Sequence, residues 1–465
     1  MMAQRTLRQW HRALAWIVGL QVALWMISGL YMTAAPIDWI HGDHWVRHDD
    51  RVLDARNAMA PSALLARYPD ASGITLKMLA QRPVYELRRG EATLLLDAVS
   101  GEIRSPLDAN AVRALAQARF AGTASPVSVD WLDHAPPEVG SRPAPLWRVT
   151  FAGASSPTLY YSPYTGELLA TRFAGWRVFD ALWMLHIMDY TTRSDVTNPL
   201  LRIAACGALA LAASGAALLI VARRRQRPGL RVPPRPWPYR LHRLAAWIVG
   251  LQLLLWIGSG LTMSLLDPAL VDGSRHARAP VPPPPLDLTG VQHPRELAAR
   301  HAGVVRSIAW RSTPDGPVYL LRTADGMQRY DARTGLPRRV DAAAALALAR
   351  ADYAGAGRPG TPQWMPRGDI ETRGHSGALW RVQFADDIGA TLYVSAETGD
   401  ILERRNRAWR LFDIAWMLHI MDYRQRESFN HPLLILFACG GVWLAGSGMW
   451  VAWRRWRNRG TRAPH

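Results

Sequence analysis

FDALWMLHIMDY, at residues 179–190, occurs a second time in this chain as FDIAWMLHIMDY at residues 412–423, with ten of the twelve positions identical. A second repeat lies upstream of each copy, WIVGLQVALWMISGLYM at residues 16–32 and WIVGLQLLLWIGSGLTM at residues 247–263. The two pairs are displaced by 233 and 231 residues. Because these displacements are nearly equal, we predict one tandem duplication, with a first half at about residues 1–227 and a second half at about residues 236–465.

Four long segments are almost free of charge, although only 49% of the whole chain is apolar. They are residues 13–35, 200–221, 244–266 and 432–453. Each has about the ~20 residues that a helix needs to cross the hydrocarbon core of a bilayer. We therefore predict four transmembrane helices. We expect the first to be retained rather than cleaved as a signal peptide, because its copy lies in the middle of the chain.

Much of the net charge of +18 comes from arginines that cluster before the first segment, between the second and third, and after the fourth. This is the pattern of the positive-inside rule. It predicts a multi-pass protein of the bacterial inner membrane, with both termini and the linker in the cytoplasm and two long periplasmic regions. The expected partner of these charges is the lipid bilayer, and we expect no nucleic acid partner.

Two cysteines, Cys206 and Cys439, occupy equivalent places in the second and fourth apolar segments. They exclude a disulfide framework in the long regions, and we expect both thiols to be buried by packing. The long regions themselves show hairpin patterns at residues 84–97, 147–167, 318–335 and 380–400, each with a turn that contains glycine. Helical patterns at 108–120 and 341–353 lie between the hairpins, which predicts an α+β fold.

The hairpins resemble the PepSY module, whose strands end in a turn of the form Asp-x-x-x-Gly followed by Glu or Asp. Residues 97–102 fit this turn, and so does the stretch from Asp331 to Gly335, although Leu336 stands where an acid is usual. The apolar segments resemble the PepSY-associated transmembrane family. Its first helix begins with His-Arg and its second is entered through Leu-His, and this chain has both elements in both halves, at His11, His242, His186 and His419.

This resemblance implies a membrane α-helical fold: a four-helix transmembrane bundle from a tandem duplication, with two exported α+β PepSY-type domains. The implied organisation places transmembrane helices at 1–35 and 241–266, exported domains at 36–175 and 267–408, and a histidine helix with its transmembrane helix at 176–222 and 409–453. A cytoplasmic linker at 223–240 and a cytoplasmic tail at 454–465 complete it.

The four duplicated histidines are the strongest indication of function. Side chains of this kind at membrane depth usually face the interior of a bundle, and two facing imidazoles are how a four-helix bundle holds a b-type haem. No Cys-x-x-Cys-His motif is present, so covalent haem attachment is excluded. We predict two b-type haems as cofactors, one with His11 and His242 as axial iron ligands and the other with His186 and His419. The alternative is that all four are interfacial histidines that reach water.

Other polar and small residues near these histidines are secondary candidates. Predicted cofactor contacts are Gln21, Gln252, Trp183 and Trp416; the alternatives are interhelical hydrogen bonds for the glutamines and an interfacial aromatic belt for the tryptophans. Ser28 and Gly29, with Ser259 and Gly260 in the second copy, share a helical face with these glutamines and have the same two interpretations. The small residues at 207, 214, 215, 440, 447 and 448 leave room for a flat ring or allow close helix packing, and we favour packing.

Two carboxylates and a histidine cluster complete the candidates. Asp189 and Asp422 follow the histidines by three positions, where they either orient an imidazole or mark the end of a helix in water. His41, His44 and His48 form either a labile metal or substrate site or an exposed polar loop, and we favour the loop.

Proteins of the resembled architecture include ferric-siderophore reductases. The resemblance implies a membrane oxidoreductase that passes electrons outward to ferric iron or a ferric siderophore, from a quinol or a cytoplasmic reductase. The alternative is a non-enzymatic PepSY membrane protein that binds peptides, restrains a protease, or serves as a sensor or assembly factor. The chain has no Walker loop, Rossmann glycine fingerprint, His-Glu-x-x-His or Ser-His-Asp grouping, so ATPase, nicotinamide-binding and hydrolase functions have no support.

Overall fold

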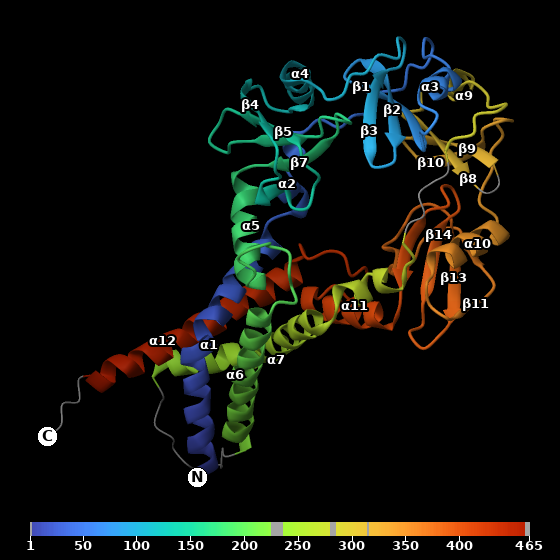
Figure 1. The fold of residues 1–465 in the computed structure, drawn as a ribbon. Coiled ribbons are helices and arrows are strands. Elements are labelled where there is room, and N and C mark those ends of the chain that lie inside the picture. The colour runs from blue at the N-terminus through green and yellow to red at the C-terminus, as the bar shows by residue number, and fades with distance from the viewer. Residues whose placement is uncertain (1, 225–235, 280–284, 314–315, 461–465) are drawn as a thin grey trace. The chain divides into compact units, whose positions relative to one another are not determined.

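A computed structural model describes residues 2–224, 236–279, 285–313 and 316–460 of the chain. Much of the predicted linker at 223–240 and the end of the predicted tail lie outside these residues. By its contacts the chain divides into two units, which are described separately. The helical unit contains residues 1–40, 177–271 and 408–465, and the sheet unit contains residues 41–176 and 272–407. Figure 1 labels most of their helices and strands.

Four helices of the helical unit are long and apolar enough to cross a membrane, which confirms the four predicted transmembrane helices. They are α1 (Met2–Ala34), α6 (Pro199–Arg224), α7 (Trp237–Leu265) and α12 (Pro432–Gly460). Two shorter helices, α5 (Ala174–Ile187) and α11 (Arg407–Ile420), contain the repeated stretch and precede α6 and α12. Single short helices follow α1 and α7: α2 (Ile37–His41) and α8 (Pro268–Val271).

The four long helices form a ring in which α1 and α7 each pack against both α6 and α12. Glycines make two of these contacts close. A Cβ on Gly207 would lie 2.9 Å from Val18 Cγ1, and one on Gly440 would lie 2.5 Å from Val249 Cγ1. Small residues at matching positions of α6 and α12 therefore allow the helices to approach, as is common in membrane bundles.

The cysteines do not contribute to this packing. Cys206 and Cys439 are both exposed on the surface of the bundle, so the prediction of buried thiols is wrong. On α6 the buried positions next to it are Ala204, Ala205 and Ala208, so Cys206 points away from the core. The outer face of a membrane helix meets apolar lipid, where a thiol is as acceptable as in a protein core.

The sheet unit has at its centre a six-stranded antiparallel sheet with strands from both halves. Its order is β10 (Gly326–Asp331), β9 (Gly316–Thr323), β8 (Ser307–Thr313), β1 (Gly73–Leu79), β2 (Arg82–Arg89) and β3 (Ala92–Asp97). The halves meet where β1 pairs with β8, with Ile74 opposite Trp310 and Leu76 opposite Ile308. All four side chains are almost fully buried. The sequence predicts a hairpin in each half but does not predict this pairing between them.

Two smaller antiparallel sheets each belong to one half. The first is β4 (Pro126–Leu132), β5 (Leu146–Phe151), β6 (Thr158–Tyr161) and β7 (Leu168–Arg172). The second is β11 (Arg358–Pro359), β13 (Leu379–Ala385), β14 (Thr391–Ser395) and β15 (Ile401–Arg405), with β12 (Gln363–Met365) also paired to β13. Each sheet packs against one helix, α4 (Ala109–Arg119) or α10 (Ala342–Asp352). The short helices α3 (Pro61–Arg67) and α9 (Pro294–Arg300) precede the hairpins of the large sheet.

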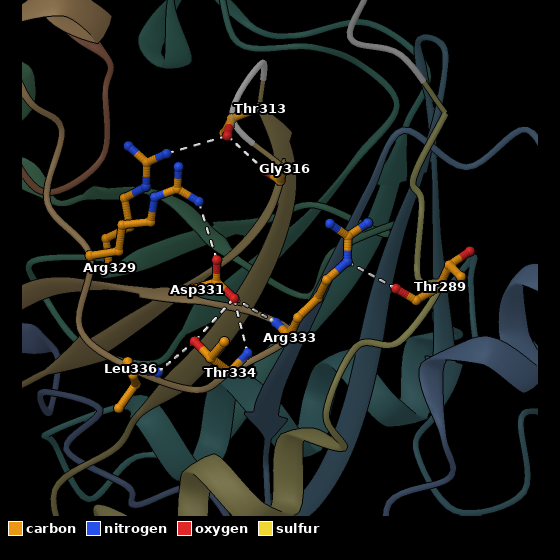
Figure 2. A network of polar contacts seen from close by, with 9 residues as sticks. Thr289, Thr313, Gly316, Arg329, Asp331, Arg333, Thr334 and Leu336 are labelled. Atoms are coloured by element: carbon orange, nitrogen blue, oxygen red, sulfur yellow. Dashed lines mark hydrogen bonds and ion pairs between the residues drawn. The ribbon is translucent and has the colours of Figure 1, made fainter.

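The turn that suggested the PepSY module is formed in both halves. Figure 2 shows the second: the Asp331 carboxylate accepts hydrogen bonds from the backbone N–H groups of Arg333 at 3.0 Å and Thr334 at 2.9 Å. Gly335 then takes a φ of +65°, which favours glycine. Leu336 contributes only its backbone, since its N–H donates to Thr334 Oγ1 and its carbonyl accepts from the N–H of Asp331. An acid at this position is therefore dispensable for the turn.

Replacing Asp331 by Ala should destabilise the sheet unit. The change removes the acceptor of two backbone N–H groups and an ion pair with Arg338 at 3.1 Å, a loss of about 2 kcal/mol for a partly buried carboxylate. We expect the thermal unfolding transition of the full chain in detergent to fall by roughly 5 °C. Asp325→Ala changes an exposed residue of the neighbouring β9–β10 turn and is the control. Equal transition temperatures for the two variants would contradict the role of Asp331.

Candidate functional site

The structure brings together two of the four duplicated histidines, His186 near the end of α5 and His419 near the end of α11. We call them the 186/419 pair. Their ring centres are 6.3 Å apart and their ring planes are nearly perpendicular, at 83°. A neutral imidazole is the form that binds metal ions.

A serine on a neighbouring long helix fixes the protonation of the His186 ring. Ser28 Oγ lies 3.0 Å from His186 Nδ1 and donates its own hydrogen to the carbonyl oxygen of Leu24 at 2.7 Å. It must therefore accept a hydrogen bond from Nδ1–H. A neutral imidazole that carries its proton on Nδ1 has an unshared electron pair on Nε2. No described residue is hydrogen-bonded to that Nε2.

The other three histidines are held in the same way. Each Nδ1 lies within hydrogen-bond distance of a serine Oγ, and that serine donates to a carbonyl of its own helix. The pairs are His419 with Ser259 at 3.1 Å, His11 with Ser214 at 3.0 Å, and His242 with Ser447 at 3.2 Å. In all three the Nδ1 atom also faces a carbonyl oxygen, which can only accept. All four rings therefore direct a free Nε2 away from the serine.

A glycine follows each of these serines, and it makes room for the ring. A Cβ on Gly215 would lie 3.1 Å from His11 Cε1, and one on Gly448 would lie 3.1 Å from His242 Cε1. The corresponding distances are 3.4 Å from Gly260 to His419 and 3.7 Å from Gly29 to His186. We call each of these four pairs a Ser-Gly seat. The sequence favours simple helix packing for the pairs on α6 and α12 and does not reveal that each of the four Ser-Gly pairs holds a histidine.

Side chains of α1 and α7 also form hydrogen bonds with the ends of the two histidine helices, α5 and α11. Trp25 Nε1 donates to the carbonyl of His186 at 2.7 Å, and Gln21 Nε2 lies 3.4 Å from the carbonyl of Leu185. In the second half Trp256 Nε1 donates to the carbonyl of His419 at 2.8 Å, and Gln252 Nε2 lies 3.4 Å from the carbonyl of Leu418. These carbonyls lie in the last helical turn, where no intrahelical donor remains. The predicted glutamines thus position the histidine backbone, and a cofactor contact by them stays a prediction.

The two predicted tryptophans act on the loops that follow the histidine helices. Trp183 Nε1 donates to the carbonyl of Arg193, and Trp416 Nε1 to that of Arg426, each at 3.0 Å. Direct contact of these tryptophans with a cofactor stays a prediction.

The two carboxylates that follow the histidines also organise the loops. Asp189 accepts hydrogen bonds from the backbone of Thr191, Thr192, Ser194 and Asp195, together with the hydroxyls of both threonines. Donors of this kind, led by the hydroxyl of Thr192, hold the pKa of Asp189 well below its usual value. Asp422 accepts from four backbone N–H groups of its own loop. Of the two roles left open, the structure places both carboxylates at the helix end rather than on an imidazole.

The remaining histidines, His11 on α1 and His242 on α7, line one cavity of about 1180 Å³ between the four long helices. We call them the 11/242 pair. The cavity is mainly apolar and includes Gly215 and Gly448 of the Ser-Gly seats. Arginines also contribute to its lining.

The histidine cluster after the first membrane helix consists of His41, His44 and His48. Among the described residues no group of three His, Cys, Asp or Glu side chains is placed to hold an ion, and this includes His41 and His48. His44 makes ring contacts with Trp45 and Phe173 instead, with centroids 5.2 and 5.1 Å away. All three histidines of the cluster are exposed. The choice between a polar loop and a labile metal or substrate site stays a prediction.

Comparison with known proteins adds one match. The profile of a family described as the PepSY-associated TM region matches residues 8–455. This span includes both histidine pairs and all four Ser-Gly seats. No curated protein matches the chain.

Proposed function

Because the chain belongs to the PepSY-associated transmembrane family, we propose that it is a dihaem electron-transfer protein of the bacterial inner membrane. One b-type haem is held by the 186/419 pair and the other by the 11/242 pair. The chain passes electrons to ferric iron or a ferric siderophore on the periplasmic side. The donor is a quinol or a cytoplasmic reductase.

The geometry of the 186/419 pair carries this proposal. An imidazole nitrogen lies about 2.0 Å from a transition metal that it binds, so two imidazoles that would hold one metal ion between them need ring centres about 6 Å apart. The observed separation of 6.3 Å matches this value. Hydrogen-bonded histidines that merely pack together need no free Nε2, whereas axial ligands do. The Ser-Gly seats leave that atom free in all four rings.

The residues around the histidines have a defined task in such a protein. Haem supplies a one-electron couple whose potential is set by its axial ligands and its surroundings. Each serine holds its imidazole in one tautomer and one orientation, and each glycine lets the ring lie close to the neighbouring helix. Hydrogen bonds from Trp25 and Trp256 fix the position of the 186/419 pair along the axes of α1 and α7.

The two pairs lie at different depths of the bundle. His11 lies on α1, and Ser28 of the same helix holds His186. These positions are 17 residues apart, or roughly 26 Å of helix. This is most of the ~30 Å thickness of a hydrocarbon core, so two haems at these depths connect the two sides of a membrane.

We also propose the tandem duplication and the orientation that the arginine clusters indicate, with cytoplasmic termini and the sheet unit in the periplasm. Reporter fusions after residue 120 and after residue 345 should both report an exported location. A fusion after residue 460 should report the cytoplasm and is the control for the reporter. A cytoplasmic signal from either of the first two fusions would overturn the topology.

Absorption spectra of the purified protein test the function directly. We expect air-oxidised and dithionite-reduced spectra of low-spin b-type haem, with two haems per chain. The reduced protein should be reoxidised by a ferric siderophore added to it. A protein without haem would instead favour the non-enzymatic alternative, a PepSY membrane protein that binds peptides or restrains a protease.

A further inference from the structure

One end of the cavity that contains the 11/242 pair is strongly basic. Four arginines line this end, Arg8, Arg12, Arg243 and Arg455, and none of the described residues that line the cavity is Asp or Glu. Among the residues that the structure describes, none of these four guanidinium groups forms an ion pair with a carboxylate. Unpaired charges of one sign around a cavity indicate a ligand of the opposite sign.

Arg8 has a defined position relative to the first histidine of the pair. It precedes His11 by three residues on α1, so the two side chains lie on one face of the helix, about 4.5 Å apart along its axis. Its guanidinium group is therefore available next to the ring, toward the end of the bundle.

The second half reaches the same arrangement with different residues. The position equivalent to Arg8 is Tyr239, three residues before His242. The Tyr239 hydroxyl accepts a hydrogen bond from Arg455 Nε of α12, and the guanidinium carbon lies 4.9 Å from the centre of the tyrosine ring. The residue of α6 that corresponds to Arg455 is Ala222. Arg12 and Arg243 follow the two histidines in both halves. Beyond these, each half contributes one more guanidinium group to this end of the cavity, Arg8 from α1 in the first half and Arg455 from α12 in the second.

We propose that Arg8 and Arg455 are a matched anion-binding pair that takes the two carboxylates of the group held between His11 and His242. This inference rests on the proposed haem function, and it names the residues that recognise the acidic edge of the haem. A guanidinium group binds a carboxylate through two parallel N–H donors, which adds orientation as well as affinity. The pair therefore orients the haem about the axis that joins the two histidines.

Haem and its dimethyl ester separate this role from a general structural one, because the ester lacks both carboxylates. The full chain with His186→Ala isolates the cavity site, and the wild-type chain is measured beside it. After haem removal in detergent, each protein is titrated with either ligand by absorption. We expect tighter binding of haem than of its ester. Arg8→Ala and Arg455→Ala should each weaken haem binding by about ten- to a hundredfold and leave ester binding unchanged.

Two further variants sharpen the test. Arg457 contacts Trp453 at 4.9 Å and does not line the cavity, so Arg457→Ala should change neither ligand. The double variant Arg8→Tyr with Ala222→Arg builds the arrangement of the second half into the first. It should restore most of the haem affinity that Arg8→Ala loses.

The outcomes distinguish this inference from the proposed function. If the arginine variants weaken both ligands equally, or neither, the anion-binding pair is wrong. It is also wrong if those variants lose bound anionic phospholipid, measured by mass spectrometry, but still bind haem more tightly than its ester by the same factor as the unchanged protein. A wild-type protein that takes up neither ligand overturns the haem function itself, and this inference with it.

Discussion

Replacing His186 by Ala should remove about half of the haem and abolish reduction of ferric siderophore by the reduced protein. The haem proposed at the 186/419 pair loses one of its two ligands, whereas the haem proposed at the 11/242 pair keeps both. Reduction fails because, in the proposed orientation, the 186/419 haem is the one nearer the periplasmic substrate. The haem-to-protein ratio follows from the pyridine haemochrome spectrum, and reduction follows from the rate of reoxidation by the siderophore.

His41→Ala is the matched control for this change, because His41 is an exposed histidine that takes no part in a histidine pair. It should leave the spectrum and the reduction unchanged. The ligand assignment fails if His186→Ala retains full haem and normal reduction. If His41→Ala loses them at the same time, the functional site lies in the cluster of residues 41–48.

Replacing Gly448, in the Ser-Gly seat of His242, by Val should remove the haem proposed at the 11/242 pair. In Gly448→Val the new Cβ lies 3.1 Å from His242 Cε1, closer than ordinary van der Waals contact, and the added methyl groups force the ring away. We expect the haem-to-protein ratio to fall to about half while the 186/419 haem stays low-spin. The electron paramagnetic resonance spectrum should accordingly lose one of its two low-spin signals.

Gly446→Val is the control for helix propensity, because Gly446 lies on the same helix and a Cβ there meets no atom within 4 Å. It should keep both haems. The two variants differ only in whether the valine meets the histidine, since each adds the same side chain to α12. Equal haem content in both would show that the glycine seat does not hold His242.

Some of this arrangement is readable from the sequence because it depends on local patterns. Runs of about 20 apolar residues suffice to predict the membrane helices, and the repeated Leu-His stretch points to His186 and His419. The Ser-Gly seats are harder to predict, because serine and glycine are common in packed membrane helices for other reasons. Their role depends on which helices are neighbours. The register that places Ser28 against His186 is a property of the folded bundle.

The pairing of β1 with β8 escaped prediction for a similar reason. Hairpins are signalled by a turn between adjacent strands, but these two strands are separated by more than 200 residues and share no turn. The alternation of buried side chains in β1 is that of any strand with one covered face. The relation of Tyr239 and Arg455 to Arg8 could not be predicted from the sequence either, because only the folded bundle brings their helices around one cavity.

The six-stranded sheet has a consequence for how the chain is made. A ribosome adds roughly 5 to 20 residues per second, so β8 emerges roughly 10 to 50 s after β1. During that interval β1 is an open edge that carries Ile74 and Leu76, the kind of edge on which strands of other chains aggregate. That edge of the newly made first half therefore stays unpaired until its own second half arrives.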